Sequence, residues 1–161
     1  NDAVLKAGYC PVLPEDDIVG ARLLYPDGLI QHAGIGFDID SNPYNLWHGA
    51  PGEYPEAMKP RYLPAVTFAC AIVDRDIWEQ LDGLDEGFVN GYEDIDFCLR
   101  ARDAGYAVRY APEIVATHLT SQTEGRFAHE VENKRYFHEK WIETGRLNYV
   151  TGVFSFSIGG R

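Results

Sequence analysis

Cysteine is scarce in this 161-residue sequence, and its three cysteines form no C-x-x-C motif. Their odd number does not suit a framework of paired disulfides. Cys70 and Cys98 stand inside the apolar runs TFACAIV and DFCLR, where a free thiol behaves as a small hydrophobic side chain. We therefore expect the chain to reside in a reducing compartment, the cytoplasm.

Basic residues are also few: 14 lysines and arginines stand against 25 aspartates and glutamates, which gives a formal net charge of -11. Such a chain repels phosphate backbones and anionic lipids, so we expect neither nucleic acid nor a membrane surface as a partner. No apolar run approaches the ~18 residues that a membrane span requires, so no span is expected. The sequence begins at Asn1 without methionine, and we expect it to be a piece of a larger parent chain.

Hydrophobic residues make up 45% of the sequence, which is enough for one domain with a real core over residues 1–161. Strand-like segments alternate with helical ones, and this alternation predicts an α/β fold. The expected elements are a hairpin of strands at 18–25 and 29–35, a long loop at 38–62, a buried strand at 64–73, a short helix at 74–81, a second helix between Asn90 and Gly105, two strands at 106–110 and 113–119 split by Pro112, and a last helix at 126–145.

The stretch NGYEDIDFCLRARDAGY, residues 90–106, gathers three carboxylates at the start of the second helix. Glu93 stands three residues after Asn90, which is the spacing of a capping box. Asp96 precedes Arg100 by four residues, so we expect these two to pair on the solvent face. Asp94 falls at the edge of the buried stripe, where a carboxyl group can have a raised pKa and act as a general base.

A calcium loop is a second interpretation of the same region. The twelve residues DGLDEGFVNGYE, 82–93, lie between two helices and place Gly87 at loop position six and Glu93 at position twelve. However, Leu84 occupies the third position, where an oxygen ligand is needed. A calcium-stabilised structural domain is therefore the weaker alternative.

The blocks VGARLLYPDGLIQHAGI and AVTFACAIVDRDIWEQLDGLDEGFVNGYEDIDFCLRARDAGYAVRYAPEIVATH closely resemble the C-terminal half of family 2 glycosyltransferases. The likeness extends over roughly residues 18–141, and its most specific part is LDEGF followed by YEDIDFCLRARDAGY. It implies the C-terminal portion of a GT-A fold, a mixed sheet with flanking helices. Such enzymes transfer a sugar from a nucleotide diphospho-sugar to a glycan or other hydroxyl acceptor, usually with inversion.

The resemblance also implies roles for individual residues. The acidic pair of the family falls on Glu93 and Asp94, and its second carboxylate, Asp94, is the base that deprotonates the acceptor. The histidine that closes the following strand, here His118, is a metal ligand in several such enzymes; its alternative is a hydrogen bond to the backbone. Arg126 falls where the family often carries a basic residue near the diphosphate. A divalent cation, Mn or Mg, is expected in the complete enzyme.

The N-terminal half that holds the donor in this family has no counterpart here, because only 17 residues precede the first matched strand. Three D-x-D strings occur, at 38–40, 74–76 and 94–96, but none follows the expected run of βα units. We therefore expect an acceptor-side half with little or no transferase activity alone. Such a half leaves an open sheet edge, which a second copy or the rest of a larger chain would cover.

Aromatic residues in the long loop supply a candidate acceptor surface. Trp47, His48 and Tyr44, with Tyr54 nearby, offer ring faces that stack on sugar C–H groups, although the same rings could simply pin the loop to the core. His32 lies in the hairpin, and we expect a structural role for it. Three functions therefore remain open: part of a transferase, a non-catalytic carbohydrate-binding module, and a calcium-stabilised domain.

Overall fold

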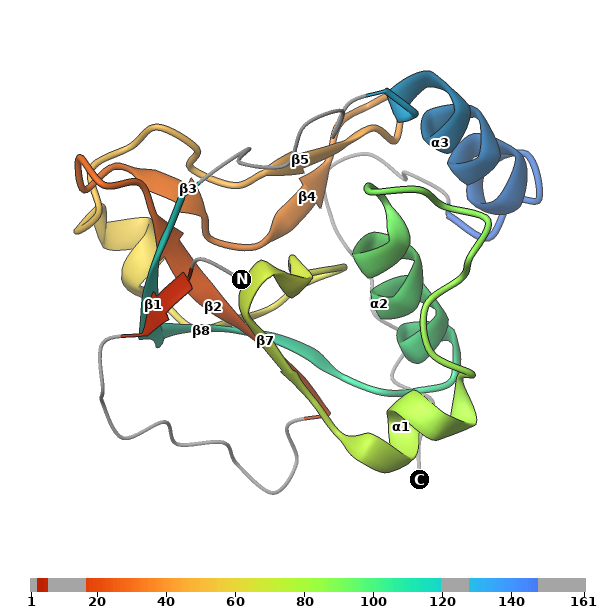
Figure 1. Cartoon of the computed structure of the whole chain (residues 1–161), viewed down its shortest axis with the longest axis horizontal. Coiled ribbons are helices and arrows are strands. Elements are labelled where there is room, and N and C mark those ends of the chain that lie inside the picture. Colours follow the sequence, from red (N-terminus) through yellow and green to blue (C-terminus); the bar gives the residue numbers. More distant parts are fainter. Residues whose placement is uncertain (1–2, 6–16, 120–127, 148–161) are drawn as a thin grey trace.

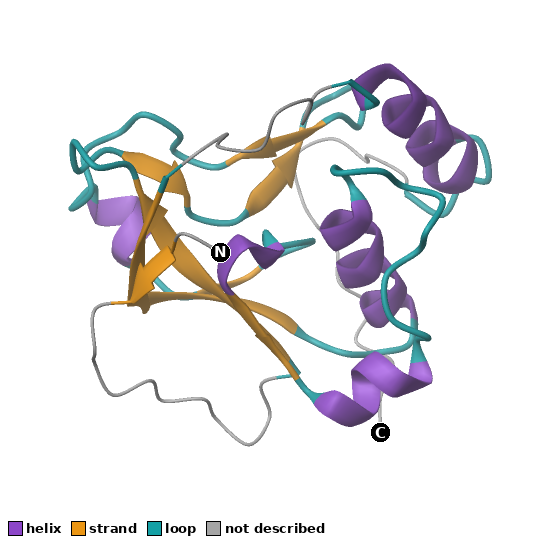
Figure 2. Cartoon of the chain, viewed as in Figure 1, coloured by secondary structure: helices purple, strands orange, loops and turns teal. Residues whose placement is uncertain are grey.

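The computed structural model describes residues 3–5, 17–119 and 128–147. It is a mixed α/β structure in which a curled sheet carries the helices beside it (Figures 1 and 2), and this confirms the expected fold class. The strands are β1 (Ala3–Leu5), β2 (Ile18–Leu24), β3 (Ile30–His32), β4 (Ile35–Phe37), β5 (Pro43–Asn45), β6 (Arg61–Tyr62), β7 (Ala71–Val73) and β8 (Val108–His118). The helices are α1 (Arg75–Gln80), α2 (Glu93–Asp103) and α3 (Glu130–Phe137), with short helical turns at Pro55–Met58, Phe68–Cys70 and His138–Ile142.

Strands β2 and β8 form the parallel centre of the sheet. Their register shifts between Ala21, which faces Ala111, and Arg22, which faces Val115, so β8 bulges over residues 112–114. Pro112 lies in this bulge, where its missing N–H costs no ladder hydrogen bond. The prediction of two strands split by Pro112 was therefore wrong: the proline bends one long strand without ending it.

The bulge also marks the point where the outer strands change. On one side of it the sheet order is β6-β8-β2-β7, and on the other side it is β1-β8-β2-β3. The expected hairpin is confirmed as the antiparallel pair β2–β3. The segment at 38–62 is more ordered than expected, because β5 pairs with β4 and β6 pairs with β8.

The apolar run at 64–73 is not the single buried strand that its composition predicts. Thr67 caps a short 3-10 turn, its hydroxyl oxygen accepting a hydrogen bond from the Ala69 N–H, and only residues 71–73 form a strand. A hydroxyl that bonds to nearby backbone competes with the sheet ladder. The break brings the Thr67 side chain and the Phe68 N–H against helix α2.

Helix α1 agrees with its prediction, and Asp74 caps it by accepting from the N–H groups of Asp76 and Ile77. Helix α2 begins at Glu93 after Tyr92, which has a φ of 73°, and no side chain caps it. The capping box between Asn90 and Glu93 was therefore a wrong prediction.

The end of helix α2 and the burial of Cys98 agree with the sequence, and Phe97 adds an aromatic contact. Gly105 follows its end in the left-handed conformation, with φ of 93°, as expected for a C-terminal glycine. Phe97 packs in the middle of the helix, and its ring centroid lies 5.5 Å from that of Phe68 and 5.1 Å from that of Trp78. The buried Cys98 thiol lies 3.7 Å from the Val66 carbonyl, among the core side chains as expected.

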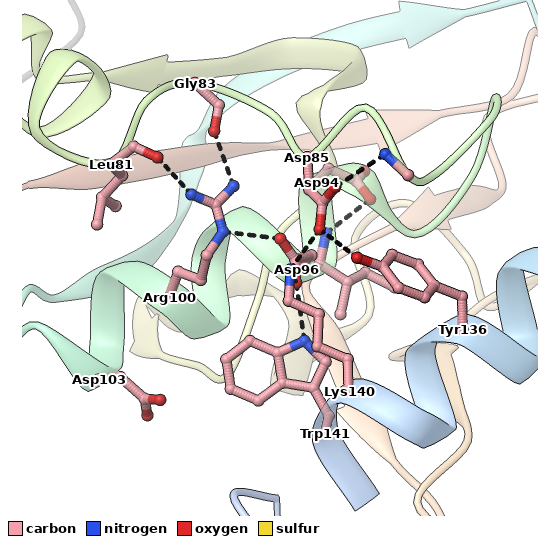
Figure 3. Close-up of polar contacts among 12 residues, drawn as sticks. Leu81, Gly83, Asp85, Asp94, Asp96, Arg100, Asp103, Tyr136, Lys140 and Trp141 are labelled. Atoms are coloured by element: carbon pink, nitrogen blue, oxygen red, sulfur yellow. Dashed lines mark hydrogen bonds and ion pairs between the residues drawn. The ribbon is translucent and has the colours of Figure 1, made fainter. Parts of the chain in front are cut away.

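The side chain of Asp96 is fully buried on the inner face of α2, and this overturns the prediction that it faces solvent. Its Oδ1 accepts from the Trp141 indole at 2.8 Å and from the Lys140 ammonium group at 2.7 Å, and its Oδ2 accepts from Arg100 Nε at 2.7 Å (Figure 3). The carboxylate therefore joins α2 to the helical turn His138–Ile142, which directly follows α3. The i,i+4 spacing of Asp96 and Arg100 was correctly interpreted as a pair, but the pair lies on the inner face.

The partners of Asp96 are themselves held by other segments. The Arg100 guanidinium donates to the carbonyl oxygens of Leu81 at 2.6 Å and Gly83 at 2.7 Å. Lys140 donates to Asp85 Oδ2 at 2.5 Å, which also accepts from the Tyr136 hydroxyl (Figure 3). Burial lowers the pKa of Lys140, but its hydrogen bonds to Asp85 and Asp96 outweigh this effect and raise it. Through Arg100 and Lys140, the carboxylate of Asp96 thus connects the loop at 81–87 with α2 and with the helical turn His138–Ile142.

Replacing Asp96 by alanine should destabilise the chain by ~3–5 kcal/mol, because Arg100 would lose its carboxylate partner, the Trp141 N–H would lose its acceptor, and Lys140 would keep only Asp85. Urea unfolding followed by circular dichroism measures the loss, either as a lower midpoint or as the absence of a cooperative transition.

Glu79→Ala is the matched control. Glu79 pairs with Arg75 at the same i,i+4 spacing, but both side chains are exposed, so its removal should cost less than ~1 kcal/mol. Equal losses for the two variants would contradict the role assigned to Asp96.

Candidate functional site

Asp94 lies in the first turn of α2 with its carboxylate turned to the residues that precede β7. Its Oδ2 accepts from the Phe68 N–H at 3.1 Å, its Oδ1 accepts from the Ile95 N–H at 2.8 Å, and the Thr67 side chain makes a further hydrogen bond. Burial raises the pKa of Asp94, the nearby charge of Glu93 adds to this, and the three hydrogen bonds oppose it. The net direction is upward, as the position of Asp94 on the helix predicted.

His32 supports the turn that holds Asp94. The ring is 1% exposed; its Nδ1 lies 2.7 Å from Asn45 Oδ1, and its Nε2 lies 3.3 Å from the Thr67 nitrogen. Since an amide N–H only donates, Nε2 is the acceptor and Nδ1 carries the proton to Asn45. Burial lowers the pKa of His32 to about 4, against the raising effect of the Asn45 hydrogen bond. The neutral ring therefore has the structural role expected for it.

Glu93 is half-buried beside Asp94. Its Oε2 is buried and has no hydrogen-bond partner among the described residues. The carboxylate therefore does not serve as a helix cap, and its clear effect is to raise the pKa of Asp94.

A cavity of about 220 Å³ opens between the β4–β5 hairpin, residues 90–92 and helix α3. Its polar and aromatic lining residues are Tyr44, Asn45, Asn90, Tyr92, Glu130 and Asn133. Asn90 and Tyr92 both have positive φ, 53° and 73°, which is strained for residues other than glycine. Such strain is concentrated at functional sites in proteins.

Of the three residues expected to bind an acceptor, one lines the cavity and two do not. Tyr44 lines the cavity and is 50% exposed. Trp47 packs against the core with the Arg61 guanidinium 5.0 Å from its ring, which fits a residue that pins its loop. His48 lies near the β2–β3 turn, where its Nε2 is 2.8 Å from the Tyr25 hydroxyl. Neither Trp47 nor His48 belongs to the cavity lining.

His118 ends β8, and its Nδ1 lies 2.6 Å from Gln31 Oε1 on β3, the strand on the other side of β2. Arg126 lies outside the described residues. Within the described ranges 3–5, 17–119 and 128–147, no group of three or more His, Cys, Asp or Glu side chains is placed to hold a metal ion. The donor set on these residues does not fit a complete metal centre, and the role of His118 and the divalent cation stay predictions.

The loop at 82–93 does not assemble the calcium site that its spacing suggested. All of its residues are described, and they form no metal-binding group. Asp85 instead accepts from the Gly87 N–H, the Tyr136 hydroxyl and the Lys140 ammonium group. The positive charge beside Asp85 is therefore that of Lys140.

Sequence reasoning missed the parts of the site that depend on distant contacts. Asn90 was interpreted as a helix cap, and Tyr92 had no predicted role, because the positive φ of both residues was not evident from the sequence. Thr67 was taken as part of a strand. The one available signal was a hydroxyl residue inside an apolar run, where it can cap a turn.

The free energy of unfolding should depend on pH through the protonation of His32. The pKa of His32 in the folded chain, about 4, lies below the ordinary value of 6.5, so its contribution to stability is complete above pH 6.5 and is lost as the pH falls toward 4. The full loss is ~3 kcal/mol, at 1.36 kcal/mol per pKa unit. Urea unfolding of the chain at pH 7, 6, 5 and 4 measures it.

His32→Gln removes the titrating group and should flatten the profile between pH 6.5 and 4 relative to the original chain. His48→Gln, at an exposed histidine of the same region, should keep the original profile. If the profile of His32→Gln is as steep as that of the original chain, the buried neutral ring is not the source of the acid sensitivity.

No family model matches the sequence. It is 34% identical over 137 residues to the uncharacterized protein y4gI of Sinorhizobium fredii, an alignment that covers 76% of this chain and 15% of that protein. It is also 33% identical over 100 residues to the O-antigen biosynthesis protein RfbC of Myxococcus xanthus, with 59% of this chain and 8% of RfbC covered. The chain thus spans a small fraction of both curated relatives. None of the helices in the described residues is long and apolar enough to cross a membrane.

Proposed function

We propose that this chain is the acceptor-side part of a family 2 glycosyltransferase of the GT-A type, in which Asp94 is the general base of an inverting sugar transfer. The observation that carries the proposal is the environment of Asp94. A carboxylate at the start of α2 is oriented by two backbone N–H groups and a threonine, and its pKa is raised by burial. These are the properties that a base for a sugar hydroxyl requires.

The proposed step needs one base on the acceptor side. Asp94 takes the proton of an acceptor hydroxyl while that oxygen bonds to the anomeric carbon of the donor sugar. The bond between this carbon and the nucleoside diphosphate breaks on the opposite face, so the configuration inverts. A carboxylate offers about four acceptor positions, and the Phe68, Ile95 and Thr67 groups occupy three, which leaves one for the hydroxyl.

The comparisons support a role in carbohydrate assembly, because one relative is an O-antigen biosynthesis protein. Since the chain spans 15% and 8% of its two relatives, the nucleotide diphospho-sugar, the glycan acceptor and the donor-binding half are proposals for the complete protein. His118 as metal ligand, Arg126 near the diphosphate and the Mn or Mg ion belong to the same proposal. The cytoplasmic location also stays a prediction.

A carbohydrate-binding module without chemistry is the second candidate. It is favoured by the cavity, whose lining includes aromatic and amide side chains but not Asp94. The two functions differ in one respect: only the transferase needs an ionised carboxylate at position 94.

Asp94→Asn should lower the rate of sugar transfer by ~10²–10⁴-fold in the longer protein that carries this chain, the range typical of losing a general base. Release of nucleoside diphosphate in the presence of an acceptor measures the rate. The fold should survive, since ionisation of a carboxyl group with a raised pKa disfavours the folded state as the pH rises above the ordinary pKa of 3.8. The neutral amide removes that cost at pH 7.

Asp103→Asn is the matched control, because Asp103 lies on the same helix but pairs with Arg146 at the surface. It should retain full activity. Unchanged transfer by Asp94→Asn, with both variants folded by circular dichroism, would rule out Asp94 as the base and leave the binding module as the better candidate.

A further inference from the structure

We propose that the cavity between the β4–β5 hairpin and helix α3 binds one ring of an uncharged sugar. The proposal rests on the proposed function only in naming that sugar as a unit of the acceptor. The binding itself requires no chemistry at Asp94.

The aromatic wall of the cavity is held in place before any ligand arrives. Tyr44 faces Gly36 across the hairpin, and a Cβ atom on Gly36 would lie 3.1 Å from the Tyr44 ring and hydroxyl. The glycine therefore lets the half-exposed ring lie against the opposite strand. Tyr92 is fixed by contacts to Phe88 and Phe137, with ring centroids 6.4 and 5.2 Å away. Rings held in this way lose little entropy on binding.

The back of the cavity is equally constrained. Asn133 is 3% exposed, and its amide accepts from the Val89 N–H at 3.0 Å and donates to the Val89 carbonyl at 2.7 Å. This double hydrogen bond fixes residues 89–91 against helix α3. The cavity of about 220 Å³ is small beside typical drug-sized pockets, which hold ~300–1,000 Å³, so it suits a single ring and not an extended chain.

The side chains that line the cavity favour a ligand that has hydroxyl groups and no net charge. Tyrosine faces carry negative potential and attract the C–H groups of a sugar ring, and the amides of Asn45 and Asn90 offer both donors and acceptors. Burial raises the pKa of Tyr92, and the charge of Glu130 adds to this, so the hydroxyl stays a donor at neutral pH. Glu130 is the charged residue of the lining, and it disfavours anionic sugars.

The cavity lies on a different side of the α2 start from the Asp94 carboxylate. Tyr92 and Ile95 line the cavity, whereas Asp94 points to Phe68. Asn45 connects the two places, since it lines the cavity and hydrogen-bonds to His32, which in turn accepts from Thr67. A ring in the cavity is therefore a neighbouring unit of the acceptor, and the hydroxyl that reacts belongs to another unit.

Titration of the isotopically labelled 161-residue chain, followed by NMR, tests the proposal. The probes are the methyl glycosides of glucose, galactose, mannose, rhamnose and N-acetylglucosamine, with methyl glucuronide as the anionic probe. We expect at least one neutral glycoside to bind with a millimolar dissociation constant, in line with its dozen or so heavy atoms, and to shift signals of residues 90–92. The glucuronide should bind more weakly.

Tyr44→Ala should weaken that binding at least tenfold. Tyr62→Ala is the matched control, because Tyr62 is 54% exposed against 50% for Tyr44 and lies on β6, outside the cavity lining. Absence of binding by every neutral glycoside would overturn the proposal. So would equal effects of the two tyrosine variants, or a glucuronide that binds as tightly as the neutral probe.

Asp94→Asn separates this proposal from the proposed function. The variant should bind the glycoside as the original chain does while transfer in the longer protein is lost. Binding that persists with transfer unaffected would support the cavity and reject the base. Loss of glycoside binding in Asp94→Asn would show that the ligand sits at the carboxylate, which would overturn the assignment of the cavity.

Discussion

The buried carboxylate of Asp96 is the interaction on which the rest of the described structure depends. A fully buried charge is tolerated only where enough donors surround it, and Asp96 has the indole of Trp141, the ammonium group of Lys140 and the guanidinium of Arg100. These donors come from α2 itself and from the helical turn His138–Ile142. The orientation of α2 is thereby set from its inner face, and Asp94, two residues before Asp96, is carried to a defined place.

The same helix shows how two carboxylates two residues apart take different roles. Asp96 is surrounded by cationic and N–H donors, whereas Asp94 has backbone N–H groups, a threonine and the nearby negative charge of Glu93. Hydrogen-bond donors favour the charged form of a carboxyl group, but around Asp94 the effects of burial and of the Glu93 charge exceed those of its donors and raise its pKa. Asp96 therefore serves as a structural contact, whereas the environment of Asp94 suits a group that accepts and gives up a proton.

Local patterns were enough to predict much of this. The β2–β3 hairpin, helix α1, the end of α2 at Gly105 and the raised pKa of Asp94 all follow from spacing and turn chemistry between near neighbours. The burial of Asp96 did not follow, because its partners Lys140 and Trp141 stand 44 and 45 residues away, and an i,i+4 pair is equally consistent with an exposed face. The cavity also escaped prediction, since its walls come from three separate segments. The break at Thr67 was not predicted, because the other nine residues of the run at 64–73 are apolar and favour one continuous strand.

The chain of contacts from Asn45 through His32 to Thr67 suggests why a neutral histidine is kept in the core. If His32 were protonated, Nε2 would carry a hydrogen toward the Thr67 N–H, and two donors would face each other at 3.3 Å. The turn at Thr67 and Phe68 would then lose its support, and with it two of the groups that orient Asp94. Burial keeps the ring neutral, so the geometry around Asp94 at neutral pH depends on a residue that never touches it. The hairpin that lines the cavity and the turn that orients the carboxylate are thus held by one ring.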